Sequence, residues 1–252
     1  ADEQRYNEDK FSVLLTGPGL PLIGAAIHLA GKPLADRPGS STGRGLHYTP
    51  DGSIADIWQW RASHGGVIGH IDNCHFGGPA LPDAAKKSGA AYAGGFAIDP
   101  GPAAYDANMA EVEAGSAHAV LPRRLPRDLA ATTRAMGRLA DGPRQSESED
   151  ARWWMSLSES IAYSPEADRR VPDGSIIPGV IVPDELRLAP DSIRGAARWA
   201  AGRWTLELRR RLVTGSPYDT TIKTGALMWV AAFDHAEKRH TRHLRPFRLE
   251  ME

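Results

Sequence analysis

Cysteine is nearly absent from this chain of 252 residues, because Cys74 is the single one. One cysteine excludes an intrachain disulfide framework and a CxxCH attachment site for c-type haem. A charge excess of one sign is also missing, since 30 lysines and arginines face 31 aspartates and glutamates. No global field therefore recruits nucleic acid or an anionic membrane, and we expect any basic patch to be local.

Long apolar runs are missing as well. The most apolar stretch, residues 14–31, is interrupted by glycines, prolines and His28, so it is too broken for a bilayer span of about 20 residues. The sequence also lacks GxSxG, P-loop and GxGxxG motifs in the required context, so a hydrolase or nucleotide-binding site has no support. The chain opens at Ala1 without Met, and we expect a processed or truncated start.

The 26 glycines and 19 prolines predict many turns and short elements instead of long helices. Trp58 and Trp60 alternate with their neighbours, which predicts a strand that places both rings on one buried face. Trp199 and Trp204 flank a short turn and predict a hairpin. In the strand that begins at Trp204, we expect Leu212 on the apolar face and Arg210 as a polar exception on that face. Strands are predicted at residues 11–15, 53–62, 204–212 and 226–233.

Short strands separated by turns favour an all-β fold, an antiparallel β-sandwich with loop and short-helix insertions. We expect one domain over residues 1–252. Its largest insertion is expected at about residues 98–150, where periodic runs are few and Asp128–Leu139 could form a modest helix.

The chain contains nine histidines, the side chains best suited to metal or haem ligation, and several of them lie close together in the sequence. His240 and His243 lie in a basic segment with Arg242 and Arg245, and that positive charge repels a bare divalent cation. The same positive charge does not repel an anionic cofactor. A haem carries propionates that arginine can hold, and its iron accepts imidazole. The alternative interpretation is a solvated basic edge that protects a strand from aggregation.

A second histidine group consists of His64, His70 and His75, the last two of which lie in GHIDNCHFGGP, residues 69–79. His70 and Asp72 are two residues apart and so share one face of a strand, with His75 following. His70, Asp72 and His75 could form a mononuclear metal site, but the group has no paired ligand spacing, and a strand that ends in a turn explains it better. A metal-dependent enzyme using these three residues is therefore the weakest of the functional hypotheses.

Five segments carry a resemblance to a known family. They are YNEDKFSVLL, GRGLHYTPDGSIADIWQWRA, SIIPGVIVP, RWAAGRWTLELRRRLVTG and MWVAAFDHAEKRHTRHLRP. In this order they resemble the ethylbenzene dehydrogenase-related haem-binding family, which includes the haem b gamma subunits of periplasmic type II enzymes of the dimethyl sulfoxide reductase superfamily. The resemblance covers most of the chain except residues 98–150.

The resemblance implies a β-sandwich that holds one haem b between an axial Met and an axial Lys. This chain departs at both positions, because the matching regions carry His47 and the pair His240 and His243. The resemblance therefore implies His47 and His243 as iron ligands, with His240 and His28 as alternatives. The implied remainder of the cofactor site is Arg242, Arg245, Trp58 and Trp60.

The resemblance also implies a function, an electron-transfer protein or subunit without a catalytic site of its own. Its expected partner is a redox protein, such as a c-type cytochrome or an oxidoreductase catalytic subunit, and its expected location is the periplasm. The competing hypothesis is a sandwich that binds carbohydrate or another ligand without redox chemistry, because the seven tryptophans could provide stacking platforms.

Overall fold

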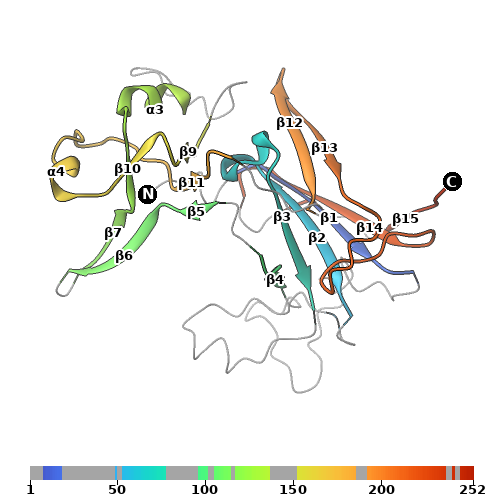
Figure 1. The fold of residues 1–252 in the computed structure, drawn as a ribbon. Helices are drawn as coiled ribbons and strands as arrows, with labels where there is room; N and C mark the ends of the chain where they lie inside the picture. Colours follow the sequence, from blue (N-terminus) through green and yellow to red (C-terminus); the bar gives the residue numbers. More distant parts are fainter. Residues whose placement is uncertain are drawn as a thin grey trace.

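The computed structural model describes residues 8–18, 49, 53–77, 96–101, 105–114, 117–136, 152–185, 192–236, 240–241 and 245–252. Within these ranges strands predominate and helices are short (Figure 1). The described part of the chain holds no helix with the length and apolar character that a membrane crossing requires. The predicted all-β fold class is confirmed.

The largest sheet has six strands in the order β15-β14-β1-β2-β3-β4, and each neighbouring pair is antiparallel. Its centre is the pair β1 and β2, in which Val13 lies opposite Trp58 and Phe11 opposite Trp60. The predicted strands at 11–15, 53–62 and 226–233 are therefore confirmed. The strands of this sheet are β1 (Lys10–Thr16), β2 (Ala55–Arg61), β3 (Ile71–Phe76), β4 (Phe96–Ile98), β14 (Leu227–Phe233) and β15 (Phe247–Arg248).

The second layer is a hairpin of β12 (Arg194–Ala200) and β13 (Arg203–Arg209). Its turn consists of Ala201 and Gly202, whose φ angles of 50° and 76° suit the two-residue turn that matches strand twist. Trp199 and Trp204 lie opposite each other beside this turn, with ring centroids 5.3 Å apart. The hairpin predicted from the two tryptophans is confirmed.

The core lies between the six-stranded sheet and this hairpin. Trp58 and Trp60, 8% and 2% exposed, point toward the hairpin, where Trp204 meets the Trp60 ring edge-on at 4.7 Å. Burying each indole contributes on the order of 2–3 kcal/mol. The inward orientation predicted for both tryptophans is confirmed. Other side chains of this core are Val13, Leu15, Ile71, Ile193, Leu206 and Leu208.

The strand predicted at 204–212 is shorter than expected, and the placement of Leu212 on its apolar face is wrong. β13 ends at Arg209, and Leu212 is 47% exposed. The reason lies in Arg210, whose guanidinium is fully buried in an ion pair with Asp56 of β2. This ion pair fixes the chain beside β2 and ends the alternation at that point.

Residues 105–185 form a second group of short elements, which lies beside the six-stranded sheet in Figure 1. In three small sheets, β11 pairs with both β5 and β9, β8 pairs with β10, and β6 pairs with β7; of these pairs, β9 and β11 alone run parallel. The interpretation of residues 98–150 as an insertion within a single domain stays a prediction. The elements are β5 (Asp106–Ala107), β6 (Met109–Ala114), β7 (Ala117–Pro122), β8 (Arg124–Pro126), α3 (Leu129–Ala135), β9 (Met155–Ser156), β10 (Ser160–Ala162), α4 (Pro165–Asp168) and β11 (Val180–Val182).

The helix predicted at Asp128–Leu139 is present as α3. Asp128 caps it, because its carboxylate accepts a hydrogen bond of 2.8 Å from the amide of Ala131. The same region also contains a hairpin of two six-residue strands, β6 and β7, for which the sequence pattern gave no expectation.

Candidate functional site

The predicted site residues that the structure describes occupy two different places. Trp58 and Trp60 are core residues of β2. His240 follows β14, where its ring lies 4.8 Å from the Phe233 ring and its Nδ1 donates to the carbonyl of Thr241 at 2.6 Å. Arg245 is exposed just before β15.

Strands β14 and β1 separate the His240 segment from the two tryptophans. Thr241 bonds to Ala232 of β14, and both Ala232 and Trp60 pair with Phe11 of β1. His47, His243, Arg242 and the alternative ligand His28 lie outside the described residues, so the predicted axial pair stays a prediction.

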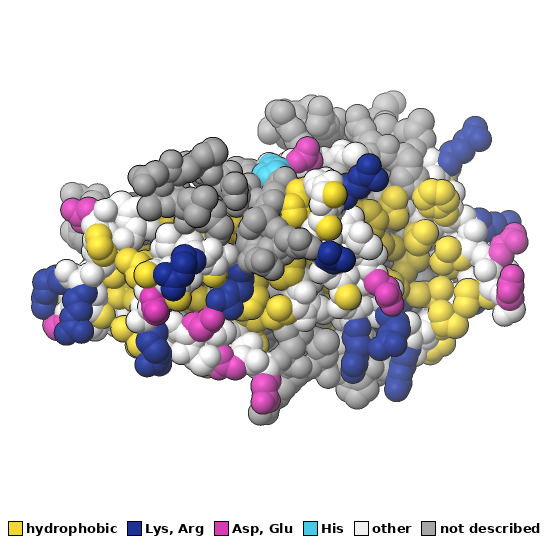
Figure 2. All heavy atoms as spheres, turned by 90° about the horizontal axis from the view of Figure 1, so that it is seen from above, with side chains coloured by type: hydrophobic (Ala, Val, Ile, Leu, Met, Phe, Trp, Pro, Cys, Tyr) yellow, Lys and Arg dark blue, Asp and Glu magenta, His cyan; other side chains and the backbone are white. Residues whose placement is uncertain are grey.

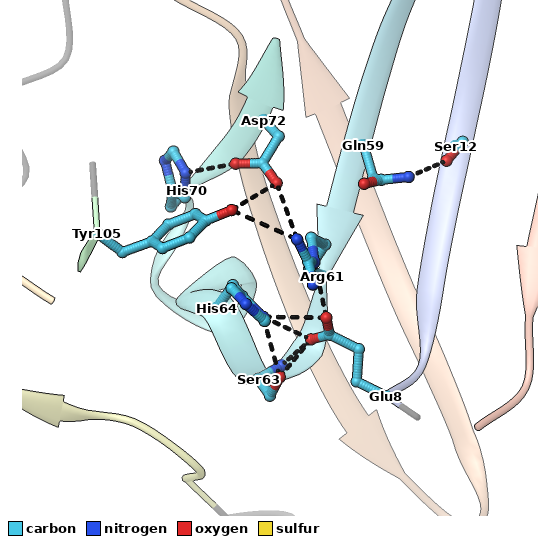
Figure 3. A network of polar contacts seen from close by, with 9 residues as sticks. All are labelled: Glu8, Ser12, Gln59, Arg61, Ser63, His64, His70, Asp72 and Tyr105. Carbon is cyan, nitrogen blue, oxygen red and sulfur yellow. Dashed lines mark hydrogen bonds and ion pairs between the residues drawn. The ribbon is translucent and has the colours of Figure 1, made fainter. Parts of the chain in front are cut away.

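The richest polar cluster among the described residues lies at the end of β2, where the chain turns into β3 (Figure 3). Two short 3-10 turns, η2 (Ala62–His64) and η3 (Gly66–Ile68), make this connection. Gly66 allows no side chain, because a Cβ there would collide with the indole of Trp60 and the carbonyl of Arg61. The tight turn brings His64 and His70 to the same side of the sheet.

Glu8 is the buried anion of this cluster and is 1% exposed. Arg61 Nε donates to its Oε1 at 2.7 Å, the amide of Ser63 donates to Oε2 at 2.7 Å, and His64 Nδ1 lies 2.9 Å from Oε1. Burial alone would raise the pKa of Glu8, but the hydrogen bond from His64 and the charges of Arg61 and His64 lower it below its ordinary value. Glu8 is therefore a carboxylate that joins the start of β1 to the turn after β2.

Tyr105 forms the other half of the cluster and comes from the second group of elements. Its hydroxyl donates to Asp72 Oδ2 at 3.1 Å and accepts from Arg61 Nη1 at 3.4 Å. Its ring lies between two imidazoles, with centroid distances of 4.8 Å to His64 and 5.3 Å to His70, both edge-on. Burial and the charge of Asp72 raise the pKa of the Tyr105 hydroxyl, so it stays protonated.

Carboxylates fix the buried histidines of this region. His70 Nε2 donates to Asp72 at 3.0 Å, and His75 Nδ1 donates to Asp99 at 2.6 Å. Because a carboxylate only accepts, the proton sits on that nitrogen, and the second nitrogen of a neutral ring keeps its lone pair. In His70 this second nitrogen, Nδ1, is buried without a hydrogen-bond partner among the described residues. Such carboxylate-held imidazoles are the type that proteins use as metal ligands.

The metal site considered for His70, Asp72 and His75 does not form. His75 turns to Asp99, and Asp72 and His75 are three residues apart on β3 and so point to opposite faces. Within the described ranges, Asp9, Asp234 and His235 form the one group of three ligand-type side chains close enough to share an ion. That group is mostly exposed.

A second buried polar group lies at the other end of β2. Arg210 pairs with Asp56 and donates to the carbonyl of Thr220 at 2.8 Å, and Asp219 lies 3.4 Å from the same guanidinium. One arginine thus faces two carboxylates, and burial raises the pKa of Asp56 to about 7 although the charge of Arg210 opposes the shift. The guanidinium also lies 4.9 Å from the Trp58 ring.

Sequence reasoning found the histidines of the first cluster but missed Glu8, Ser63 and Tyr105. Glu8 is 55 residues from Ser63 and Arg61 is 44 residues from Tyr105. Contacts at such separations leave no local pattern in a single sequence. Arg210 was noticed as an exception in an alternating strand, and that exception was the signal of a buried ion pair.

One comparison with known proteins bears on this site. A family model described as ethylbenzene dehydrogenase matches residues 1–245, a range that contains both polar groups and the six-stranded sheet as far as β14. Neither the curated proteins nor the solved structures include a significant match.

Proposed function

The chain belongs to the ethylbenzene dehydrogenase family, and from this premise we propose that it is a haem b-binding electron-transfer protein or subunit. Its role is to pass single electrons between a redox enzyme and a cytochrome-type partner, without substrate chemistry of its own. The observation that carries the proposal is the family match over residues 1–245, because that family is related to redox enzyme subunits.

The chemistry of the histidines in the described fold fits such a cofactor. Haem iron accepts neutral imidazole, and a fixed tautomer presents the ligand nitrogen in one orientation. His64 Nδ1 lies 2.9 Å from the Glu8 carboxylate and His75 Nδ1 lies 2.6 Å from the Asp99 carboxylate, so in each ring Nε2 is the nitrogen that does not face the carboxylate. The fold thus contains imidazoles oriented by carboxylates, although these two are not the assigned iron ligands.

We assign the axial positions to His47 and His243, with His28 and His240 as alternatives. Arg242 and Arg245 would hold the propionates. Trp58 and Trp60 are packed between β2 and the hairpin β12–β13, so they would stabilise the sheet beside the site instead of contacting the cofactor. When bound, a haem with two imidazole ligands takes up and releases one electron without an open coordination position. The chain's own residues hold the ligand protons, neutralise the propionates and exclude water.

The competing hypothesis of a carbohydrate-binding sandwich loses its main support in this arrangement. Trp58, Trp60, Trp154 and Trp229 are between 2% and 8% exposed, so their rings are packed against protein and cannot stack on a sugar. Trp204 is packed against Trp60 in the same core.

A pyridine haemochrome spectrum of the purified protein tests the proposal. A dissociable b-type signal at one haem per chain supports it, and a protein that neither retains nor takes up haem overturns it. The axial assignment is tested separately by His47→Ala and His243→Ala, each of which should lose the low-spin spectrum. His235→Ala is the matched control, because His235 is an exposed histidine outside the assigned set. A normal spectrum in the His47 variant would transfer the role to His28 or to the group His64–His75.

We further propose a redox protein partner, such as a c-type cytochrome or an oxidoreductase catalytic subunit, and a periplasmic location. Both follow from the family resemblance. Cell fractionation tests the location, and recovery of the protein with the cytoplasmic fraction would contradict it.

A further inference from the structure

The outer face of the hairpin β12–β13 carries a concentration of positive charge. Residues alternate along both strands, and those that point away from the core are exposed. This outer face contains four arginines and a single acidic residue, Glu207. Its formal charge is therefore +4 − 1 = +3. The outward residues are Arg194, Ala196, Arg198, Arg203, Thr205, Glu207 and Arg209.

The arrangement of these arginines is unfavourable for the hairpin by itself. Arg194 and Arg209 are direct cross-strand partners, and like charges in that position repel each other. Figure 2 shows, from above, lysines and arginines in several small groups, with acidic side chains beside some of them. An anionic group placed over the Arg194 and Arg209 pair would relieve its repulsion.

The charge of the rest of the molecule decides which anion fits. The whole chain has a formal charge of −1, so all residues outside this face, buried ones included, sum to −1 − 3 = −4. A long polyanion such as nucleic acid would be repelled by that remainder, whereas a protein with a small acidic patch would contact the arginines alone. The strands are seven residues long, about 23 Å at 3.3 Å per residue, which suits a small and transient interface.

The inner face of the same hairpin leads directly to the core. Trp199 and Trp204 lie 5.3 Å apart under the basic face, and Trp204 lies 4.7 Å from Trp60 on β2. A partner docked on the outer face would thus lie one strand layer away from three successive indoles.

We propose that the outer face of β12–β13 is the docking surface for an acidic protein partner. The inference rests on the proposed electron-transfer function for the identity of that partner as a redox protein. The contact itself depends only on the arginines of the hairpin.

The test measures binding of poly-L-glutamate of about six residues, which is no longer than the hairpin, and of a single-stranded DNA 20-mer, at low and at physiological salt. Wild-type protein should bind polyglutamate, more weakly as salt rises, and hydrogen exchange should slow in residues 194–209. Replacing Arg194 and Arg209 together by Gln should weaken binding about tenfold. Glu207→Gln should strengthen it.

The matched control is the double replacement of Arg169 and Arg170 by Gln, which removes the same charge from an exposed site after α4. Equal weakening in the control would overturn the proposal, as would tighter binding of DNA than of polyglutamate. These measurements need no haem. A protein that neither retains nor takes up haem but binds polyglutamate through the hairpin would overturn the proposed function and leave the docking surface intact.

Discussion

The free energy of unfolding should decrease as pH rises from 5 to 8 because of a single carboxyl group, Asp56. This residue is buried beside Arg210, and its pKa is raised from 3.8 to about 7. At pH values between these two pKa values, Asp56 is protonated in the folded state but ionised in the unfolded state, so raising the pH favours unfolding. For these pKa values the linkage relation gives about 3 kcal/mol of stability at pH 5 that is lost by pH 8.

Asp56→Asn isolates this contribution, because it removes the titrating group while Asp219 still lies 3.4 Å from the Arg210 guanidinium. Urea unfolding of wild type and variant at both pH values gives four free energies. The wild type should lose about 3 kcal/mol more than the variant between pH 5 and pH 8. Equal pH dependence in the two proteins would refute the reasoning that one arginine between two buried carboxylates leaves Asp56 protonated.

Three further predictions concern β2 and the turn that follows it. Trp60→Ala should lower the free energy of unfolding by about 3–5 kcal/mol because it empties the centre of the core, and the denaturation midpoint measures this. Gly66→Ala should destabilise the fold by more than 1 kcal/mol, whereas Gly202→Ala, where a Cβ meets nothing within 4 Å, should cost less in the same assay. Glu8→Gln should cost about 1–3 kcal/mol at neutral pH, because it removes the charged partner that accepts from the half-buried Arg61 and leaves Asp72 at 3.9 Å as the remaining anion. Since the pKa of Glu8 is lowered in the folded state, the difference between wild type and Glu8→Gln should shrink as pH falls below 4.5; a constant difference would contradict it.

The strands that could be predicted are those whose sequence alternates against a buried face. Trp58 and Trp60 on β2 and Trp204 on β13 defined the core because period-two alternation is a local property. The small sheets of residues 105–185 escaped prediction because β5, β8, β9 and β11 have only two or three residues each. Such short strands depend on partners distant in the chain, and Val180, for example, pairs with Ala107.

The candidate site was predictable only in its residue types. Histidine and carboxylate at positions 70 and 72 share a strand face, and the structure joins them. The pairing of His75 with Asp99 and of His64 with Glu8 required the fold, because each crosses a strand boundary. Burial of these pairs is equally a tertiary property, since no neighbour in sequence excludes water from them.

The two polar groups share one arrangement, an arginine that contacts two carboxyl groups. These contacts hold the segments before and after the strands against the sheet. At one end of β2, Arg61 lies 2.7 Å from Glu8 and 3.9 Å from Asp72; at the other end, Arg210 lies between Asp56 and Asp219. Arg61 adds side-chain contacts to strands that are already paired, whereas Arg210 joins β2 to the segment after β13, which does not pair with β2. Because the second layer over this face is a hairpin of two strands, apolar burial alone covers little of the six-stranded sheet. Charge pairs add directional contacts at both ends of β2, because at each end one arginine contacts two carboxyl groups.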